Sequence, residues 1–215
     1  MNPESSDPLG KRASWSKRQF ARLLAADSAI ARPQYDVRKR TLLGGLSGAV
    51  FEIGPGTGAN LAYYARDVRW SGLEPNPAMF PYLEERARQL DMDVHVRAGY
   101  AEQIPAADAS VDAVVGTFVL CSVADPAQVL REVRRILKPG GQYVFMEHVA
   151  APHPSGLRFV QGIIKPLWRA AGDGCTLDRE TWITIEQAGF KEVQIEHFRM
   201  PVPVYSPHIA GIAIK

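Results

Sequence analysis

Residues 49–58 read AVFEIGPGTG, an apolar run followed at once by three glycines within five residues. The apolar run predicts a buried strand, and the glycines predict a tight turn into a helix. Glycine lets backbone N–H groups approach a ligand closely, so a loop of this kind is typical of a nucleotide site. About 20 residues later a second apolar run ends in Leu73-Glu74-Pro75, where a carboxylate can accept both hydroxyls of a ribose.

Short apolar runs alternate with amphipathic helical stretches from residue 49 to the C-terminus. This alternation predicts an α/β fold, a parallel sheet with right-handed crossovers and helices on both faces. In such a sheet a ligand binds beyond the carboxyl ends of the strands, where residues 54–58 and Glu74 both fall. The predicted strands cover residues 49–53, 70–74, 93–97, 111–118, 142–147, 193–198 and 209–214. The predicted helices cover residues 59–66, 78–90, 126–137, 157–170 and 179–188.

The composition excludes several classes of protein. The chain has 215 residues, 46% apolar and 22% charged, which fits one globular domain and excludes a disordered, collagen-like or coiled-coil chain. Its net charge of +2 gives no reason to expect a nucleic-acid partner. The two cysteines, Cys121 and Cys175, provide neither a disulfide framework nor a four-cysteine zinc site, and the spacing of cysteines and histidines shows no metal pattern.

We expect a cytoplasmic protein without a membrane span. The longest uncharged run in the apolar middle of the chain, residues 113–124, is shorter than the roughly 20 residues that a span needs. The first nine residues are polar and lack the apolar core of a signal peptide. Two cysteines in such a chain are expected to stay reduced.

Residues 1–45 differ from the rest of the chain, residues 46–215, in their charge. They carry nine basic and four acidic residues, a net charge of +5. A rough helical stripe is formed by Trp15, Phe20, Leu23, Leu24 and Ile30. We interpret this segment either as a helix packed on the edge of the domain, or as a lid over a substrate pocket that also makes weak contact with an anionic membrane surface.

A nicotinamide enzyme is one alternative, because residues 54–59 also match the dinucleotide fingerprint G-x-G-x-x-A. Three features favour another ligand. Glu52 lies within the strand, where it can reach the positive end of a ligand. The loop begins only at residue 54, which leaves little room for a substrate domain before it. The single Tyr-x-x-x-Lys motif, Tyr35–Lys39, precedes the loop instead of following it.

The motif Glu52-x-Gly54-x-Gly56-x-Gly58, together with Glu74 and LKPGG at residues 137–141, resembles the class I S-adenosylmethionine-dependent methyltransferases. The resemblance implies a Rossmann-like, seven-stranded, mostly parallel sheet with an antiparallel last strand. It also implies S-adenosyl-L-methionine as methyl donor and S-adenosyl-L-homocysteine as product. The loop would hold the methionine part, Glu74 the ribose, and residues 99–105 the adenine, with Tyr100 where many members have aspartate. The implied cofactor-binding residues are Glu52, Gly54, Gly56, Gly58, Asn60, Glu74, Pro75, Tyr100, Ala101, Glu102, Thr117 and Cys121.

Further stretches are similar to the thiol S-methyltransferases, whose animal members are held on membranes by an N-terminal hydrophobic helix that this sequence lacks. Those stretches are residues 119–123, 145–149, 172–175, 179–182 and 207–209. The resemblance implies a small lipophilic acceptor, preferentially a thiol. A thiol is already partly ionised at neutral pH, so its methylation requires no strong base.

Three residues are candidates for a catalytic role. His148 follows the fifth strand, and His208 begins the last one; if that strand is antiparallel, both lie at the ligand edge and can take a proton. Asp173 lies in a glycine-rich turn, either as a helix cap or as a pocket carboxylate. Large aromatic side chains that either wall an acceptor site or form plain core are Trp15, Phe20, Trp168 and Trp182.

Two other functions stay open at this point. One is an O-, C- or N-methyltransferase that acts on a phenol, a quinone or a phospholipid amine. The other is a module that binds S-adenosylmethionine without catalysis.

Overall fold

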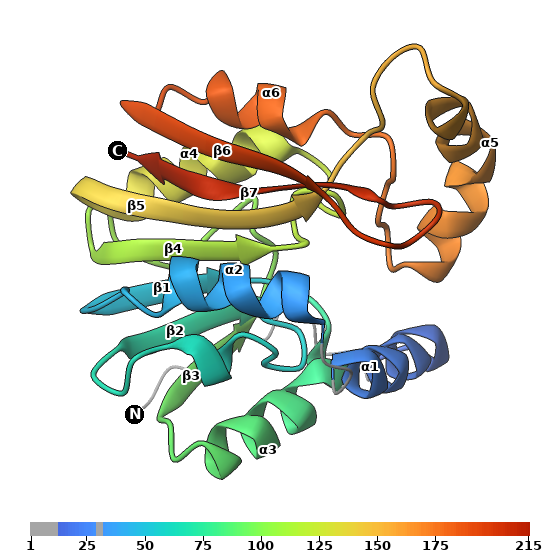
Figure 1. Ribbon diagram of the computed structural model, residues 1–215. Helices are drawn as coiled ribbons and strands as arrows, with labels where there is room; N and C mark the ends of the chain where they lie inside the picture. The colour runs from blue at the N-terminus through green and yellow to red at the C-terminus, as the bar shows by residue number, and fades with distance from the viewer. Residues whose placement is uncertain (1–12, 29–31) are drawn as a thin grey trace.

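The structure is a computed structural model that describes residues 13–28 and 32–215, apart from the side chain of Ser28. Its strands are β1 (Ala49–Ile53), β2 (Arg69–Glu74), β3 (Val94–Ala98), β4 (Val111–Thr117), β5 (Leu137–His148), β6 (Glu192–Arg199) and β7 (Pro207–Ile214). They form one sheet in the order β3-β2-β1-β4-β5-β7-β6 (Figure 1). Only β7 runs antiparallel to its neighbours, β5 and β6. The predicted Rossmann-like, mostly parallel sheet with an antiparallel last strand is confirmed.

Helices cover both faces of the sheet. The described α-helices are α1 (Trp15–Ser28), α2 (Pro33–Leu43), α3 (Phe80–Gln89), α4 (Pro126–Ile136), α5 (Gly156–Ala171) and α6 (Thr181–Glu186), with 3₁₀ turns η1 (Leu61–Tyr63) and η2 (Pro77–Met79). Leu43 of α2 and Leu83 of α3 belong to one buried cluster, and Val129 of α4 and Ile185 of α6 belong to the other. The strands between them are apolar toward both faces, as a sheet buried on two sides requires.

The order of the strands fixes where a ligand can bind. The chain proceeds outward from β1 through β2 to β3, and then returns to the other side of β1 with β4 and β5. The carboxyl ends of β1 and β4 therefore face a crevice at this reversal point. Helices α1 and α5 lie beyond the same end of the sheet (Figure 1).

The helix predicted over residues 59–66 is wrong. The chain makes only the short turn η1 there, because Asn60 and Tyr64 both turn their polar groups toward the buried carboxylate of Glu52. Tyr64 itself has an extended backbone, with ψ at 149°, which ends the turn. The helix predicted over residues 179–188 is shorter than expected, covering Thr181–Glu186.

The basic N-terminal segment contains two helices with different roles. Helix α2 packs on the sheet through Leu43, and its Arg38 pairs with Glu196 of β6. Helix α1 instead lies at the ligand end of the sheet (Figure 1), with Trp15 and Leu23 each 70% exposed. Ile30 lies outside the described residues. No helix in the described part of the chain is long and apolar enough to cross a membrane.

Candidate active site

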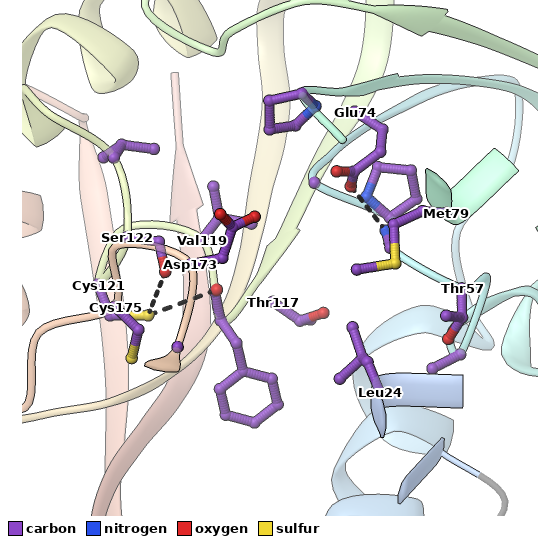
Figure 2. A pocket seen from close by; sticks show the side chains of 18 of the residues that line it. Leu24, Thr57, Glu74, Met79, Thr117, Val119, Cys121, Ser122, Asp173 and Cys175 are labelled. Carbon is purple, nitrogen blue, oxygen red and sulfur yellow. Dashed lines mark hydrogen bonds between the residues drawn. The ribbon is translucent and has the colours of Figure 1, made fainter. Parts of the chain in front are cut away.

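A cavity of about 650 Å³ opens at the carboxyl ends of the strands. One part of its wall is formed by Gly54, Gly56, Asn60 and Glu74, which we call the glycine-loop half. The other part, which we call the histidine half, is formed by Tyr35, Cys121, His148, Cys175 and His208. Figure 2 shows Glu74 on one side of the cavity and the two cysteines on the other.

The glycine loop is shaped by backbone that favours residues without a side chain. Gly54, Gly56 and Gly58 have φ values of 60°, 56° and 79°. A Cβ on Gly54 would come within 2.7 Å of Val119, so the loop can pass this close to the segment after β4 only with glycine. Gly58 does not line the cavity; it faces Leu61 and makes the turn.

Glu74 connects the end of β2 to the glycine loop. Its carboxylate accepts hydrogen bonds from the backbone N–H of Gly56, at 3.0 Å (Figure 2), and of Asn76, at 2.8 Å. Burial raises the pKa of Glu74 to about 7, against the opposing effect of these two bonds. Each oxygen keeps further lone pairs, so the carboxylate can accept two hydroxyl groups from a ligand in the cavity.

Glu52 does not line the cavity, contrary to the expectation that it reaches the ligand. Its buried carboxylate accepts hydrogen bonds from Asn60, Tyr64 and Trp70, and burial raises its pKa. Asn60 Nδ2 also donates to Thr117 at 2.9 Å, which leaves Asn60 Oδ1 buried without a hydrogen-bond partner among the described residues. Because Asn60 lines the cavity, this oxygen is available to a donor on a ligand.

The segment predicted to contact an adenine borders the glycine-loop half. Tyr100, Ala101 and Glu102 all line the cavity, and the Tyr100 side chain is 54% exposed. Glu102 accepts hydrogen bonds from the backbone N–H of Ala124 and Asp125, so it fastens this segment to the start of α4. Its role is therefore to position the segment.

In the histidine half, two cysteines and a histidine meet. His148 Nε2 lies 2.9 Å from Cys175 Sγ, and the ligand atoms of Cys121, His148 and Cys175 all lie within 4.8 Å of one another. Trp168 donates its indole N–H to Cys175 Sγ at 3.3 Å. His148 Nδ1 is buried and has no hydrogen-bond partner among the described residues.

Ionisation in this cluster is shifted by the contacts. Contact with Cys121 lowers the pKa of Cys175, and the hydrogen bond and charge of His148 act in the same direction against burial. Contact with Cys175 and burial raise the pKa of Cys121, whose Sγ donates to the Phe118 carbonyl at 3.4 Å. Burial alone would lower the pKa of His148, but its contact with Cys175 outweighs this and raises it. The contact between the two side chains therefore favours the thiolate of Cys175 and the protonated ring of His148.

His208 lies opposite His148 in the pairing of β5 with β7. Its Nδ1 lies 3.0 Å from the carbonyl of Ser206, so Nδ1 donates and Nε2 accepts from the Tyr35 hydroxyl at 2.8 Å. Burial lowers the pKa of His208 to about 4. The ring is therefore neutral at physiological pH, and its Nε2 already accepts a hydrogen bond from Tyr35. Both features make His208 a poor general base, and it contributes a polar surface to the cavity wall.

Asp173 lies on the rim of the cavity. It occupies the left-handed region, with φ at 48°, directly before Gly174 at 96°. Its negative charge contributes to the raised pKa of Glu74. This turn brings Cys175 inward, toward His148.

Comparisons with known proteins identify methyltransferases as relatives of this chain. The Methyltransf_11 family, described as a methyltransferase domain, matches residues 51–145. Thiol S-methyltransferase TMT1B of Homo sapiens is 40% identical, over 93% of this chain and 87% of its own length. Thiol S-methyltransferase TMT1A of Homo sapiens is 38% identical, over 94% of this chain and 89% of its own length. The chain therefore belongs to the family of the thiol S-methyltransferases.

The solved structures agree with the fold. A SAM-dependent methyltransferase from Aquifex aeolicus superimposes with a TM-score of 0.63 at 18% identity, covering 92% of this chain and 97% of its own. The predicted resemblance to class I methyltransferases and to thiol S-methyltransferases is confirmed, and so is the prediction that the protein is an enzyme.

Most residues predicted for the cofactor of this methyltransferase do line the cavity. Those that do are Gly54, Gly56, Asn60, Glu74, Pro75, Tyr100, Ala101, Glu102, Thr117 and Cys121. Glu52 and Gly58 do not line the cavity. The candidates His148, His208 and Asp173 line it as well. Their catalytic role stays a prediction.

Sequence reasoning missed Tyr35 and Phe118 in the histidine half. The ring of Tyr35 contacts Phe118 and His208. Cys175, to which no role was assigned, is the centre of the cluster with His148. One signal was available for Phe118: it directly follows β4, at the strand end where ligands bind. Of the four large aromatics considered as acceptor walls, Phe20 and Trp168 line the cavity.

Proposed function

We propose that the protein transfers a methyl group from S-adenosyl-L-methionine to a small lipophilic thiol, with a thioether and S-adenosyl-L-homocysteine as products. One observation carries the proposal: a single cavity joins a glycine loop and a ribose-type carboxylate to a wall of aromatic, thiol and imidazole groups. Relatives that share 40% and 38% of their residues with nearly the whole chain are named thiol S-methyltransferases.

The residues of the glycine-loop half fit the methyl donor. The orphaned Asn60 Oδ1 offers an acceptor for the ammonium group of the methionine part, and Glu74 offers two oxygens for ribose hydroxyls. The glycines let the loop lie close to Val119 and Leu24, where an added Cβ would be crowded. Tyr100 and Ala101 would border the adenine. When bound, the donor supplies a methyl group activated by its positively charged sulfur.

The main contribution of the protein to this reaction is to align the acceptor with the methyl group, and acid–base catalysis is secondary. A methyl transfer requires the nucleophile and the methyl carbon to be aligned about 3–3.5 Å apart. The rings of Tyr35, Phe118 and Trp168 provide an apolar wall that excludes water from the acceptor and orients it. His208 and the hydrogen-bonded pair of His148 with Cys175 are polar groups that face the same space.

An acceptor series tests the function directly. Incubation with donor labelled in its methyl group should label lipophilic alkyl and aryl thiols, and the alcohol or phenol of the same carbon skeleton should be labelled at a rate lower by at least about 100-fold. Amines and quinols extend the panel to the N-, O- and C-acceptors. Preferred labelling of an oxygen or nitrogen acceptor would contradict a thiol enzyme, and binding of the donor without transfer to any acceptor would indicate a non-catalytic module.

We also propose that α1 acts as a lid over the glycine-loop half. Phe20 and Leu24 line the cavity, and Leu24 lies so close to Gly56 that a Cβ there would come within 3.3 Å of it. Lys17 Nζ donates to the Pro75 carbonyl, and Asn76 Nδ2 donates to the Lys17 carbonyl, so two hydrogen bonds join α1 to the turn after β2 and support a docked position of the helix. Helix α2 is attached to the sheet through Leu43 and Arg38, so the proposed lid is α1.

A weak contact with a membrane surface is our proposal for the outer faces of α1 and α5. Phe159, Ile163 and Leu167 of α5 are 70%, 62% and 76% exposed, and the helix carries no acidic residue. Such a face suits an anionic bilayer surface. Sedimentation with phosphatidylserine vesicles should capture the protein and release it at high salt. Equal capture of a Phe159→Ser/Leu167→Ser variant would contradict this contact.

For localisation we propose the cytoplasm. The thiols Cys121 and Cys175 are free and close together, a pair that a reducing compartment preserves. Cell fractionation of the native host tests this, and recovery of the protein outside the cytoplasm would contradict it.

A further inference from the structure

The methyltransferase has two cysteines in the whole chain, and both meet at His148 on the cavity wall. Cys121 follows β4, His148 ends β5, and Cys175 comes from the turn after α5, so three distant segments supply the three groups. Two sulfurs and one imidazole form the ligand set that zinc takes in catalytic sites that keep a fourth position for substrate. We propose that Cys121, His148 and Cys175 bind one zinc ion whose fourth coordination position faces the cavity.

The distances are close to what the ion requires. Zn–S bonds of about 2.3 Å and Zn–N bonds of about 2.0 Å at tetrahedral angles place sulfur and nitrogen roughly 3.6 Å apart, and two sulfurs roughly 3.8 Å apart. All three ligand atoms lie within 4.8 Å of one another, and His148 Nε2 and Cys175 Sγ are separated by 2.9 Å. A tetrahedral site requires the His148–Cys175 contact to open by about 0.7 Å, which is within reach of a side-chain rotation.

The surrounding backbone holds the ligands in place. Glu147 accepts hydrogen bonds from the backbone N–H of Val119 and Leu120 at 2.9 Å each, which fixes the turn that carries Cys121. Thr176 donates both its backbone N–H and its hydroxyl to the Cys121 carbonyl, which ties the Cys175 turn to the Cys121 turn. Trp168 donates to Cys175 Sγ, the kind of outer hydrogen bond that orients metal ligands.

The fourth position gives the site a function in the proposed reaction, on which this part of the inference rests. An acceptor thiol that binds there loses its proton to solvent and becomes a metal-bound thiolate. Its sulfur then forms the new S–C bond, the S–CH₃ bond of the donor breaks, and the electron pair of that bond stays on the sulfur of S-adenosylhomocysteine. A soft metal holds a thiolate better than an alkoxide, so it selects sulfur acceptors over oxygen acceptors.

Cobalt(II) is the probe for this site, because it replaces zinc and is coloured. The reduced full-length protein, stripped with a chelator, should bind one equivalent of Co²⁺. The complex should show thiolate-to-cobalt charge transfer in the near ultraviolet and the visible bands of tetrahedral cobalt, and Zn²⁺ should remove both. Cys121→Ser and Cys175→Ser should each weaken the charge-transfer band and lower affinity by at least about 100-fold, more than the loss of an outer partner costs.

His95→Gln is the matched control, since His95 is an exposed imidazole next to Asp93, away from the cluster. It should bind Co²⁺ like the unchanged protein. Circular dichroism and thermal unfolding report whether each variant folds. Octahedral cobalt without charge transfer, or equal Co²⁺ affinity of the folded Cys121→Ser/Cys175→Ser protein, would overturn the metal site.

The role of the fourth position is tested on the cobalt-loaded protein. An acceptor thiol should shift the charge-transfer band, and the matched alcohol should leave it unchanged. If the thiol does not shift the band, the acceptor does not bind at the fourth position. If the proposed function is wrong but the metal site exists, no thiol is methylated with or without metal, and the protein still shows the spectrum of tetrahedral, thiolate-bound cobalt.

Discussion

The glycine-loop half and the histidine half of the cavity are assembled in different ways. The first consists of backbone, one carboxylate and one amide, all within residues 54–74. The second takes side chains from segments as distant as Tyr35 and His208, which are 173 positions apart and joined by a hydrogen bond. Backbone geometry suits a donor that every such enzyme shares, whereas side chains can differ to suit one acceptor. Changes in the two halves should therefore separate donor binding from acceptor turnover.

The largest effect is expected at Glu74. Glu74→Gln removes the charge that strengthens hydrogen bonds to ribose hydroxyls, each worth about 1.5–3 kcal/mol. Calorimetry should show S-adenosylhomocysteine bound roughly 30- to 100-fold more weakly, since about 1.4 kcal/mol is tenfold. Glu84→Gln, on the exposed side of α3, is the matched control and should bind normally. An unchanged affinity in Glu74→Gln would place the ribose elsewhere.

A pH dependence should follow from the same carboxylate. Burial raises the pKa of Glu74 to about 7 in the free protein, and the ligand hydroxyls favour the ionised form. The affinity for S-adenosylhomocysteine should therefore fall about tenfold from pH 8 to pH 6, as one proton has to be released on binding. The slope should disappear in Glu74→Gln. A flat profile in the unchanged protein, or tighter binding at pH 6, contradicts this assignment.

In the histidine half, Tyr35→Phe should affect the acceptor alone. The change removes the hydrogen bond to His208 Nε2, worth about 0.5–1.5 kcal/mol, and leaves the ring in place. We expect kcat/KM for a thiol to fall about three- to tenfold and the affinity for the donor product to stay the same. Tyr82→Phe, on α3, is the control. A loss of donor affinity in Tyr35→Phe would mean that the two halves are not separate.

The smallest effect is expected at the lid. Leu24→Ala removes the side chain that lies against Gly56, a half-buried contact worth about 1 kcal/mol, so the donor KM should rise roughly fivefold. Leu23→Ala, the next residue of α1 and 70% exposed, should leave it unchanged. If both variants behave alike in steady-state kinetics, α1 does not act as a lid.

The contrast between the halves also explains what the sequence could predict. The strand order, the glycine loop and Glu74 follow from contiguous patterns, because the turn and the strand ends are local properties of the chain. The meeting of Cys121, His148 and Cys175 depends on how three segments pack, and no spacing in the sequence encodes it. The helix expected after Gly58 failed because the buried carboxylate of Glu52 draws in Asn60 and Tyr64, a tertiary contact that overrides helical propensity.

A crystal structure of the protein with S-adenosylhomocysteine tests the central claim most directly. We predict that both ribose hydroxyls bind the Glu74 carboxylate and that the sulfur faces the wall of His148 and Cys175, with space for an acceptor between them. A nucleoside bound outside this cavity, or a sulfur turned away from the histidine half, would contradict the account.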